Sequence, residues 1–167
     1  KAVYNHVELG KLDLVVDIKS LNEEQKTLRR KVHQTIRKVS DDVSRRLTFN
    51  TAIAAVMELM NDVAKFKDTS DQGSAVMQEA LEATTLLLAP IAPHICHELW
   101  SDLGHNEAVI HAPWPCFDES ALVVSSQQIV MQVNGKVRAK LDAPANADKE
   151  TLEKLAFSDE NVKRFVN

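Results

Sequence analysis

The sequence predicts a mainly α-helical protein, in which an antiparallel four-helix bundle precedes a small α+β module made of a β-hairpin and two short helices. Between residues 22 and 102, apolar residues recur at steps of three and four, as on the buried face of a helix. The connections between these stretches are short, which favours antiparallel neighbours. After Pro115 the apolar residues alternate, as in strands. We expect a bundle over residues 1–117, a linker over 118–127 and the module over 128–167.

Residues that typically end or begin a helix indicate the limits of the first two helical stretches. Residues 1–9 read as the last turns of a helix that Gly10 closes. A longer helix is expected from about Asn22 to Arg46, and Ser20-x-x-Glu23 indicates a capping box at its start. Its apolar stripe consists of Leu28, Val32, Ile36, Val39 and Val43.

The next two helices are separated by a polar loop. Thr48 or Asn50 can cap a helix that runs to about Phe66. The stretch KDTSDQGS then reads as a loop, and a further helix is expected from about Ser74 to Leu88. Pro90 stops this helix because proline cannot continue the backbone hydrogen bonding.

The last helix of the bundle is expected between Pro93 and Gly104. Histidines and cysteines gather around it, which raises the question of a metal site; they are His94, Cys96, His97, His105, His111 and Cys116. Zinc sites favour ligand pairs at short, repeated spacings, and these residues have none. We therefore expect no metal site, and we expect Cys96 to be a buried, small apolar residue.

The C-terminal module begins with a hairpin signal. Asn134-Gly135 stands between two alternating runs, and this pair favours the type I′ turn because both residues tolerate positive φ. We expect Ile129, Met131 and Val133 on one face, and Lys136, Arg138 and Lys140 together on the solvent side of the returning strand. Asp148 and Ser158 can cap two short helices that follow.

Positive charge is concentrated in two islands, although the net charge of the chain is −4. Residues 22–46 hold eight Lys and Arg against four Asp and Glu, whereas residues 49–131 hold two against eleven. Residues 132–141 hold three basic residues and no acid. Because local potential governs docking, the two islands are candidate contacts for a polyanion, while a solvated helix face is the plain alternative.

The first island lies on the side of the 22–46 helix opposite its apolar stripe at 100° per residue. The candidate phosphate-binding residues of the two islands are Lys26, Arg30, His33, Arg37, Lys38, Arg45, Lys136, Arg138 and Lys140. Arg46 falls close to the apolar stripe, so we expect it to pair with an acid of a neighbouring helix instead. Arg29 borders the same seam and is compatible with either role.

No catalytic constellation is visible in the sequence. Glycine occurs four times and always alone, so there is no glycine-rich phosphate loop. Neither cysteine has a neighbouring base or an oxyanion device, so a nucleophilic site is not expected. Trp100 is expected in the core, and Trp114 is expected to pin its loop to the bundle; stacking of either on a base is the alternative.

The composition is that of a globular protein with reduced thiols. No apolar run approaches the ~18 residues of a membrane helix, and no secretory leader opens the chain, so we expect no membrane and a cytoplasmic location. The two cysteines are not closely spaced, which fits a reducing compartment. The chain begins at Lys1 without a methionine, and we expect it to be a piece of a longer protein.

Five segments, in order, resemble the helical domain that follows the catalytic core of class I aminoacyl-tRNA synthetases. They are RRKVHQTIRKVSDDV, FNTAIAAVMELMN, APIAPHICHELW, HAPWP and IVMQVNGKVRAKL, within residues 28–141. The last segment, directly after the APWP loop, resembles the bacterial leucyl type. A valyl type implies a terminal coiled coil and an isoleucyl type often a Cys-x-x-Cys zinc module, and neither pattern is present.

The resemblance implies a tRNA-binding appendage with leucine-specific tRNA as its partner, in a parent ligase that is monomeric. The chain contains neither a His-Ile-Gly-His-like nor a Lys-Met-Ser-Lys-Ser-like signature. The resemblance therefore implies that this chain holds no cofactor and that ATP and Mg bind in the catalytic domain of the parent. The alternative hypothesis is a helical protein–protein interaction module whose basic face docks an acidic partner.

Overall fold

The computed structural model describes residues 1–123 with their side chains and the backbone of residues 126–133 and 136–144. The protein is mainly α-helical, as predicted. It divides into two compact units, Lys1–Leu122 and Val123–Asn167. No helix in the described ranges is long and apolar enough to cross a membrane.

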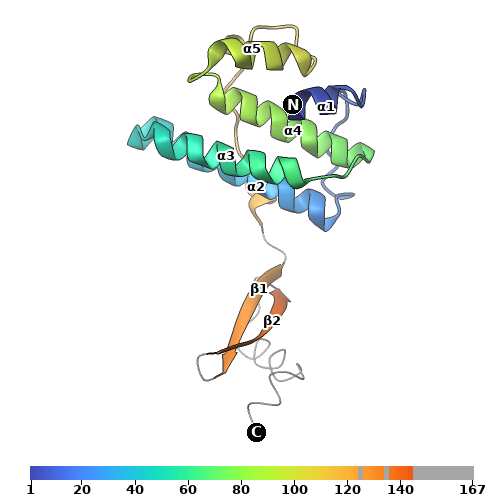
Figure 1. Cartoon of the computed structure of the whole chain (residues 1–167), viewed down its shortest axis with the longest axis vertical. Helices are drawn as coiled ribbons and strands as arrows, with labels where there is room; N and C mark the ends of the chain where they lie inside the picture. Colours follow the sequence, from blue (N-terminus) through green and yellow to red (C-terminus); the bar gives the residue numbers. More distant parts are fainter. Residues whose placement is uncertain (124–125, 134–135, 145–167) are drawn as a thin grey trace. The chain divides into compact units, whose positions relative to one another are not determined.

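Three consecutive helices that alternate in direction form the centre of the first unit. They are α2 (Glu23–Asp41), α3 (Phe49–Lys65) and α4 (Asp71–Leu88), and each contacts the other two. Figure 1 shows that the chain reverses direction from each of these helices to the next. Short connections therefore give antiparallel neighbours, as expected.

A second layer covers the outer side of α4. It contains α1 (Ala2–Val7), α5 (Pro93–Asp102) and the 3-10 helix η2 (Val109–His111), and α5 makes its main contacts with α4, α1 and η2 (Figure 1). The fourth predicted helix is thus present, but it lies outside the three-helix core. His6 of α1 shares a 2.8 Å hydrogen bond with Gln78 of α4, which ties the two layers together.

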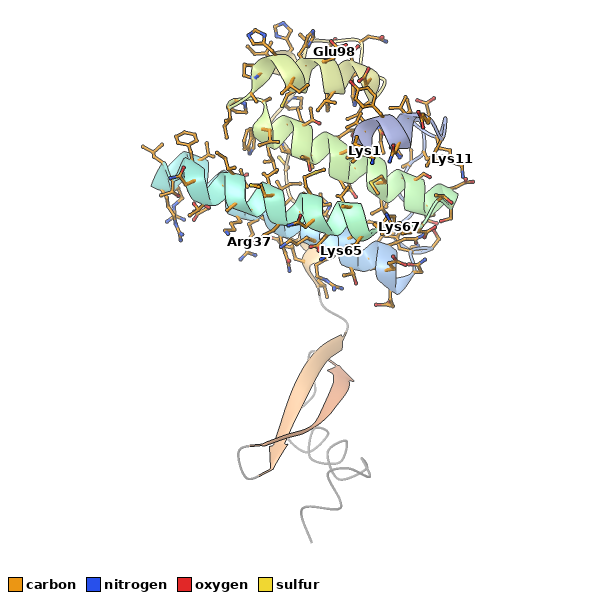
Figure 2. All side chains as sticks on the ribbon, in the orientation of Figure 1. Lys1, Lys11, Arg37, Lys65, Lys67 and Glu98 are labelled. Atoms are coloured by element: carbon orange, nitrogen blue, oxygen red, sulfur yellow. The ribbon has the colours of Figure 1, made fainter. Side chains whose placement is uncertain are left out.

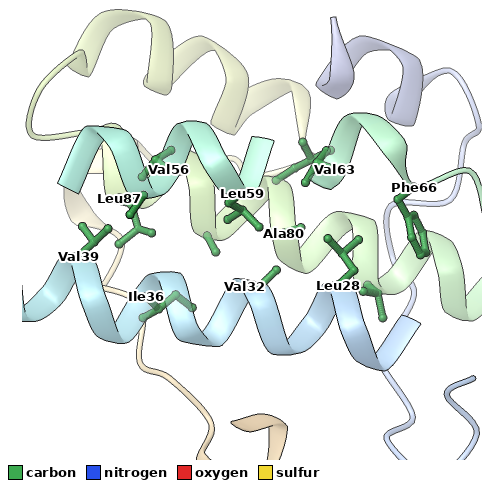
Figure 3. Close-up of a cluster of buried hydrophobic side chains, with 14 of the residues drawn as sticks. Leu28, Val32, Ile36, Val39, Val56, Leu59, Val63, Phe66, Ala80 and Leu87 are labelled. Carbon is green, nitrogen blue, oxygen red and sulfur yellow. The ribbon is translucent and has the colours of Figure 1, made fainter. Parts of the chain in front are cut away.

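The core lies where α2, α3 and α4 face one another (Figure 3). Four of the five residues in the predicted stripe of α2 are buried, and Val43 is partly buried against the core. The partners from α3 are Val56, Leu59 and Val63, and those from α4 include Val76, Ala80 and Leu87. Burial of each large aliphatic side chain stabilises the fold by about 1.5–3 kcal/mol.

The start of α2 differs from the predicted capping box by two residues. Asn22 is the N-cap: its side chain accepts from the Gln25 amide at 2.9 Å, and the Gln25 side chain accepts from the Asn22 amide at 2.8 Å. This reciprocal pair satisfies two amides at once. The Ser20 hydroxyl instead donates to the Asp17 carbonyl, so the predicted Ser20–Glu23 box is wrong.

The start of α4 lies three residues before the predicted Ser74. Ser70 caps this helix by accepting from the Gly73 amide at 3.1 Å. Gly73 lies in the first turn because Asp68 packs against it: a Cβ there would stand 2.6 Å from both Cγ and the carbonyl oxygen of Asp68. The glycine that reads as a loop residue is needed for this close approach.

The C-terminal end of α2 is irregular. The helix continues as the π-helical turn η1 (Asp42–Arg46), and Leu47 then adopts a left-handed conformation with φ of 52°. The Thr48 amide donates to the Asp42 carbonyl at 2.9 Å, and α3 begins at the next residue. The expected helix to Arg46 is therefore correct in extent, although its last turn is wider than an α-helix.

The first unit ends with the short helix α6 (Glu119–Leu122), which contacts α2. Residues 118–122, expected in a linker, are therefore part of this unit.

The second unit contains an antiparallel pair, β1 (Ser126–Val133) and β2 (Lys136–Pro144). The register shifts between Met131 and Gln132, so that Lys140 lies opposite Val130 but Lys136 lies opposite Val133. A common face for Lys136, Arg138 and Lys140 does not follow from this register. The predicted Asn134-Gly135 turn and the helices predicted at Asp148 and Ser158 lie outside the described residues.

A pair of substitutions on α3 tests the three-helix core. Leu59 is fully buried, whereas Met57, two residues away, is 64% exposed. Leu59→Ala should lower the free energy of unfolding by about 2–5 kcal/mol, because it leaves a cavity among α2, α3 and α4. Met57→Ala should change it by less than about 0.5 kcal/mol. Urea unfolding of both variants measures the difference, and equal effects would contradict this core.

Candidate nucleic-acid interface

The outer side of α2 presents two free cations. Arg37 and Lys38 are exposed, and neither makes an ion pair among the described side chains. Figure 2 places Arg37 on the side of the bundle opposite α5. An unpaired, solvated cation can exchange water for phosphate oxygens without first breaking a protein contact.

The other predicted cations of α2 are more constrained. Lys26 is half-buried and pairs with Glu23 at 2.9 Å on its own helix. Arg30 is half-buried, and its Nε is buried without a hydrogen-bond partner in the described part of the chain. Arg45 is exposed, with Nη1 3.1 Å from a carboxylate oxygen of Asp41. These three keep surface access, but their charge is partly compensated or shielded.

A groove runs beside the end of α2 and the π-helical turn. Its basic wall contains Arg37, Lys38, Arg45 and Arg46. Ser40 and Ser44 add hydroxyls, and Phe117 and Leu122 form its apolar side. Asp41 and Asp42 also line it and pair with Arg45 and Arg46, so Arg37 and Lys38 are the cations of the groove without an ion pair among the described residues. Cations, hydroxyls and an apolar wall within one groove suit a phosphate–sugar backbone.

Arg46 does not have the predicted role. Its side chain is 67% exposed, and its guanidinium pairs with Asp41 at 3.1 Å and with Asp42 at 3.8 Å. Both acids belong to its own helix, so the expected pair with a neighbouring helix is wrong. The predicted position of Arg46 assumes a rotation of about 100° per residue through Asp42–Arg46. In the π-helical turn that these residues form, the rotation per residue is smaller. The assumed rotation therefore placed Arg46 too close to the apolar stripe.

Arg29 makes the internal ion pair instead. Its side chain is 9% exposed, and its Nε and Nη2 donate to the two carboxylate oxygens of Glu79 at 3.0 and 3.3 Å. Nη2 also donates to Asp118 at 3.0 Å. One guanidinium therefore joins α2, α4 and the segment that leads into α6, in the bidentate geometry that suits arginine.

His33 belongs to the same buried network, so its predicted place on the basic surface is wrong. It is 4% exposed, and its Nδ1 accepts from the Asp118 amide at 3.1 Å. Nε2 therefore carries the hydrogen and donates to Glu79 at 3.0 Å. The segment from Asp118 covers this side of α2, and helical spacing alone gives no sign of that cover.

The two acids of the network have lowered pKa values. Burial acts to raise the pKa of Glu79, but hydrogen bonds from His33 and Arg29 and the positive charge of Arg29 outweigh it. Hydrogen bonds from Ser120 and from Arg29 lower the pKa of Asp118 to about 2. Neither acid stands out in the sequence; the available signal was that Glu79 is one of only two acids between Ser74 and Leu88.

The histidines and cysteines of residues 94–116 do not come together. Within residues 1–123, no group of three His, Cys, Asp or Glu side chains could hold a metal ion. Cys96 is buried, which raises the pKa of its thiol. Trp100 is buried and stacks on His105 with 3.6 Å between ring centroids. The Trp114 indole donates to Ser40 of α2 at 2.8 Å, so it does pin its loop to the bundle.

Comparison with known proteins relates the chain to tRNA ligases. The family described as the anticodon-binding domain of tRNA ligase matches residues 25–153. The leucine–tRNA ligase of Saccharophagus degradans is 60% identical over 168 aligned residues, covering 100% of this chain and 20% of that protein. That of Alcanivorax borkumensis is 60% identical over 166 residues, covering 99% and 20%. The chain thus spans about a fifth of the length of these relatives.

A solved structure has a similar fold. It is a crystal structure of the ternary complex of Agrobacterium radiobacter K84 agnB2 LeuRS, tRNA and LeuAMS. The TM-score is 0.76 at 29% sequence identity, and the match covers 98% of this chain and 22% of that one.

Removal of Arg29 tests the buried network. Arg29→Ala should lower the free energy of unfolding by about 1–3 kcal/mol, because it leaves the partly buried Glu79 carboxylate without its guanidinium. Lys31→Ala is the matched control on the same helix: Lys31 pairs with Glu58 at 3.1 Å on the surface, so its loss should cost less than about 1 kcal/mol. Denaturant unfolding compares the two, and a cost for Arg29→Ala no larger than that for Lys31→Ala would refute the assignment.

The lowered pKa of Asp118 predicts a pH dependence. An unfolded aspartate has a pKa of about 3.9, and the folded value is about 2. Ionised Asp118 therefore stabilises the fold above about pH 4, and this contribution is lost as the pH falls towards about 2. The destabilisation caused by Asp118→Asn should be largest near neutral pH and shrink through this window. Unfolding curves of both proteins across that range test it; a constant difference would count against an ionised Asp118 in the network.

Proposed function

This chain belongs to the anticodon-binding domain family of tRNA ligases, and on that premise we propose that it is the tRNA-binding helical domain of a bacterial-type leucine–tRNA ligase. The identity of 60% to leucine–tRNA ligases over the full chain supports the leucine type. The domain positions tRNA for a catalytic domain outside this chain.

The unpaired cations of α2 carry the proposal. Arg37 and Lys38 are exposed, lack ion-pair partners among the described residues and line one groove. Phosphate contacts fix the orientation of a nucleic acid without reading its sequence, and A-form RNA is recognised mainly through its backbone and 2′-hydroxyls. The groove would therefore hold a tRNA strand by its backbone.

Other cations extend the proposed surface. On α2 these are Lys26, Arg30 and Arg45, which keep surface access despite their constraints. In the second unit they are Lys136, Arg138 and Lys140, on a strand with no acid between them. His33 is excluded because the buried network uses both of its ring nitrogens.

The remaining properties of the proposed parent follow from its class. Its partner would be leucine-specific tRNA, and ATP and Mg would bind in its catalytic domain. We propose that the parent is monomeric and cytoplasmic and has no membrane partner. We also propose that residues 128–167 form a hairpin followed by two short helices.

A double substitution tests the proposed phosphate contacts. Each lost contact should flatten the plot of log affinity against log salt by roughly 0.7–0.9 units, so Arg37→Ala with Lys38→Ala should flatten it by about 1.5 units and weaken tRNA binding. Amino-acid activation by the parent ligase should be nearly unchanged, because it needs no tRNA contact. Binding is measured at several salt concentrations, and activation by pyrophosphate exchange.

The matched control replaces two lysines at the C-terminal end of α3, away from the groove. Lys65 and Lys67 are exposed, but Lys65 pairs with Asp62 and Lys67 donates to the Ala64 carbonyl. Lys65→Ala with Lys67→Ala should leave the salt slope unchanged. If the α2 variant also keeps the wild-type slope, the groove is only a solvated surface.

A further inference from the structure

Two local irregularities meet where α2 turns into α3, in residues Arg45–Phe49, which we call the α2–α3 corner. The helix widens into a π-helical turn, a feature found frequently at functional sites. Leu47 then has φ of 52° and ψ of 35°, and no other non-glycine residue in the described part of the chain has positive φ. A left-handed leucine is unfavourable because its Cβ crowds the backbone, and glycine or asparagine is the usual residue there.

Packing of the corner side chains does not compensate for the unfavourable backbone conformation of Leu47. Leu47 is 71% exposed and Phe49 is 46% exposed. An exposed leucine contributes little to the core, so folding gains nothing visible from leucine over glycine at this position. Strain that the fold does not need is an indication of function.

Two arginines directly precede these apolar groups in the chain, and one acid holds both of them. Asp41 holds both: Oδ1 lies 3.1 Å from Nη1 of Arg45, and Oδ2 lies 3.1 Å from Nε of Arg46. Their side chains are nevertheless 81% and 67% exposed. Each guanidinium has five N–H donors, so both keep donors for another ligand while Asp41 limits their motion.

We propose that the α2–α3 corner contacts one unpaired nucleotide of the bound RNA, with Leu47 and Phe49 against the base and Arg45 and Arg46 on the adjacent phosphates. This inference rests on the proposed function and extends it from backbone contacts to a base. Aromatic and apolar side chains reach base faces only where a nucleotide is unstacked, in a loop, bulge or end. Combined stacking and cationic contacts are typical of proteins that bind single-stranded nucleic acid.

Charge favours RNA over a protein surface as the occupant. Residues 37–49 hold four basic and two acidic side chains. Arg45 and Arg46 also line the groove that contains Arg37 and Lys38, so the corner continues the proposed phosphate-binding surface. An apolar tip at the end of a basic groove suits a base that leaves the helical stack while its backbone stays in the groove.

Leu47→Gly separates a binding role from a structural one. Glycine adopts positive φ without strain, so the variant should fold and its melting temperature should stay the same or rise by a few degrees. Combined with Phe49→Ala, it should weaken tRNA binding by the parent ligase about tenfold, as expected for the loss of one stacked base. The salt slope should not change, because no phosphate contact is removed.

Two matched variants serve as controls. Leu47→Asn combined with Phe49→Ala also tolerates positive φ at residue 47 but lacks both apolar side chains, so it should lose affinity as the Leu47→Gly Phe49→Ala variant does. Met57→Ala removes an equally exposed apolar side chain of α3 away from the corner and should bind tRNA as the wild type does. Chemical probing of the tRNA should show one unpaired nucleotide that the wild type protects and the Leu47→Gly Phe49→Ala variant does not.

The outcomes distinguish this inference from the function on which it rests. Wild-type tRNA affinity in the corner variants, with a flattened slope in Arg37→Ala Lys38→Ala, would overturn the nucleotide contact and leave the proposed function standing. Wild-type behaviour in both sets would overturn both. Weaker amino-acid activation with unchanged tRNA binding would show that the corner packs against the rest of the ligase, which also overturns the inference.

Discussion

The ion pair between the buried Arg29 and the partly buried Glu79 is the interaction on which the arrangement of the first unit depends. It lies between α2 and α4, beside the aliphatic core, and it holds Asp118 through the same guanidinium. A charge in that position is tolerated only when its partners satisfy it, and here His33 and Ser120 complete the set of hydrogen bonds. The network fixes how α2 sits on α4 and where the chain leaves the bundle.

This constraint also determines which cations remain outside. Helix α2 uses one face for the core and one side for the network, so its basic residues separate into two groups. Arg29 is buried in the ion pair with Glu79, whereas Arg37 and Lys38 are exposed and make no ion pair among the described residues. The basic surface is thus smaller than the charge count of the helix indicates. It is concentrated near the end of α2, where the π-helical turn adds Arg45 and Arg46 to the groove.

Much of the fold follows from local sequence, and the departures have identifiable causes. The periodicity of α2 gave its buried stripe correctly, and Pro93 and Gly104 marked the limits of α5, because these signals act within one or two turns. The cap at Asn22 and the early start of α4 depend on side chains competing for the same amides. Arg46 was misplaced because a helical wheel assumes a constant pitch. The roles of Arg29 and His33 depend on residues 46 to 89 positions away, which no local pattern reveals.

The central claim is that the outer side of α2, near its C-terminal end, faces the RNA. Lysine reactivity towards an acetylating reagent, followed by mass spectrometry of the parent ligase with and without tRNA, measures this directly. Lys38 should lose reactivity when tRNA binds, because phosphates would cover its ammonium group. Lys67, which lies at the opposite end of α3 from the α2–α3 corner, should react equally in both states (Figure 2). Unchanged reactivity of Lys38 in a saturated tRNA complex would contradict the account.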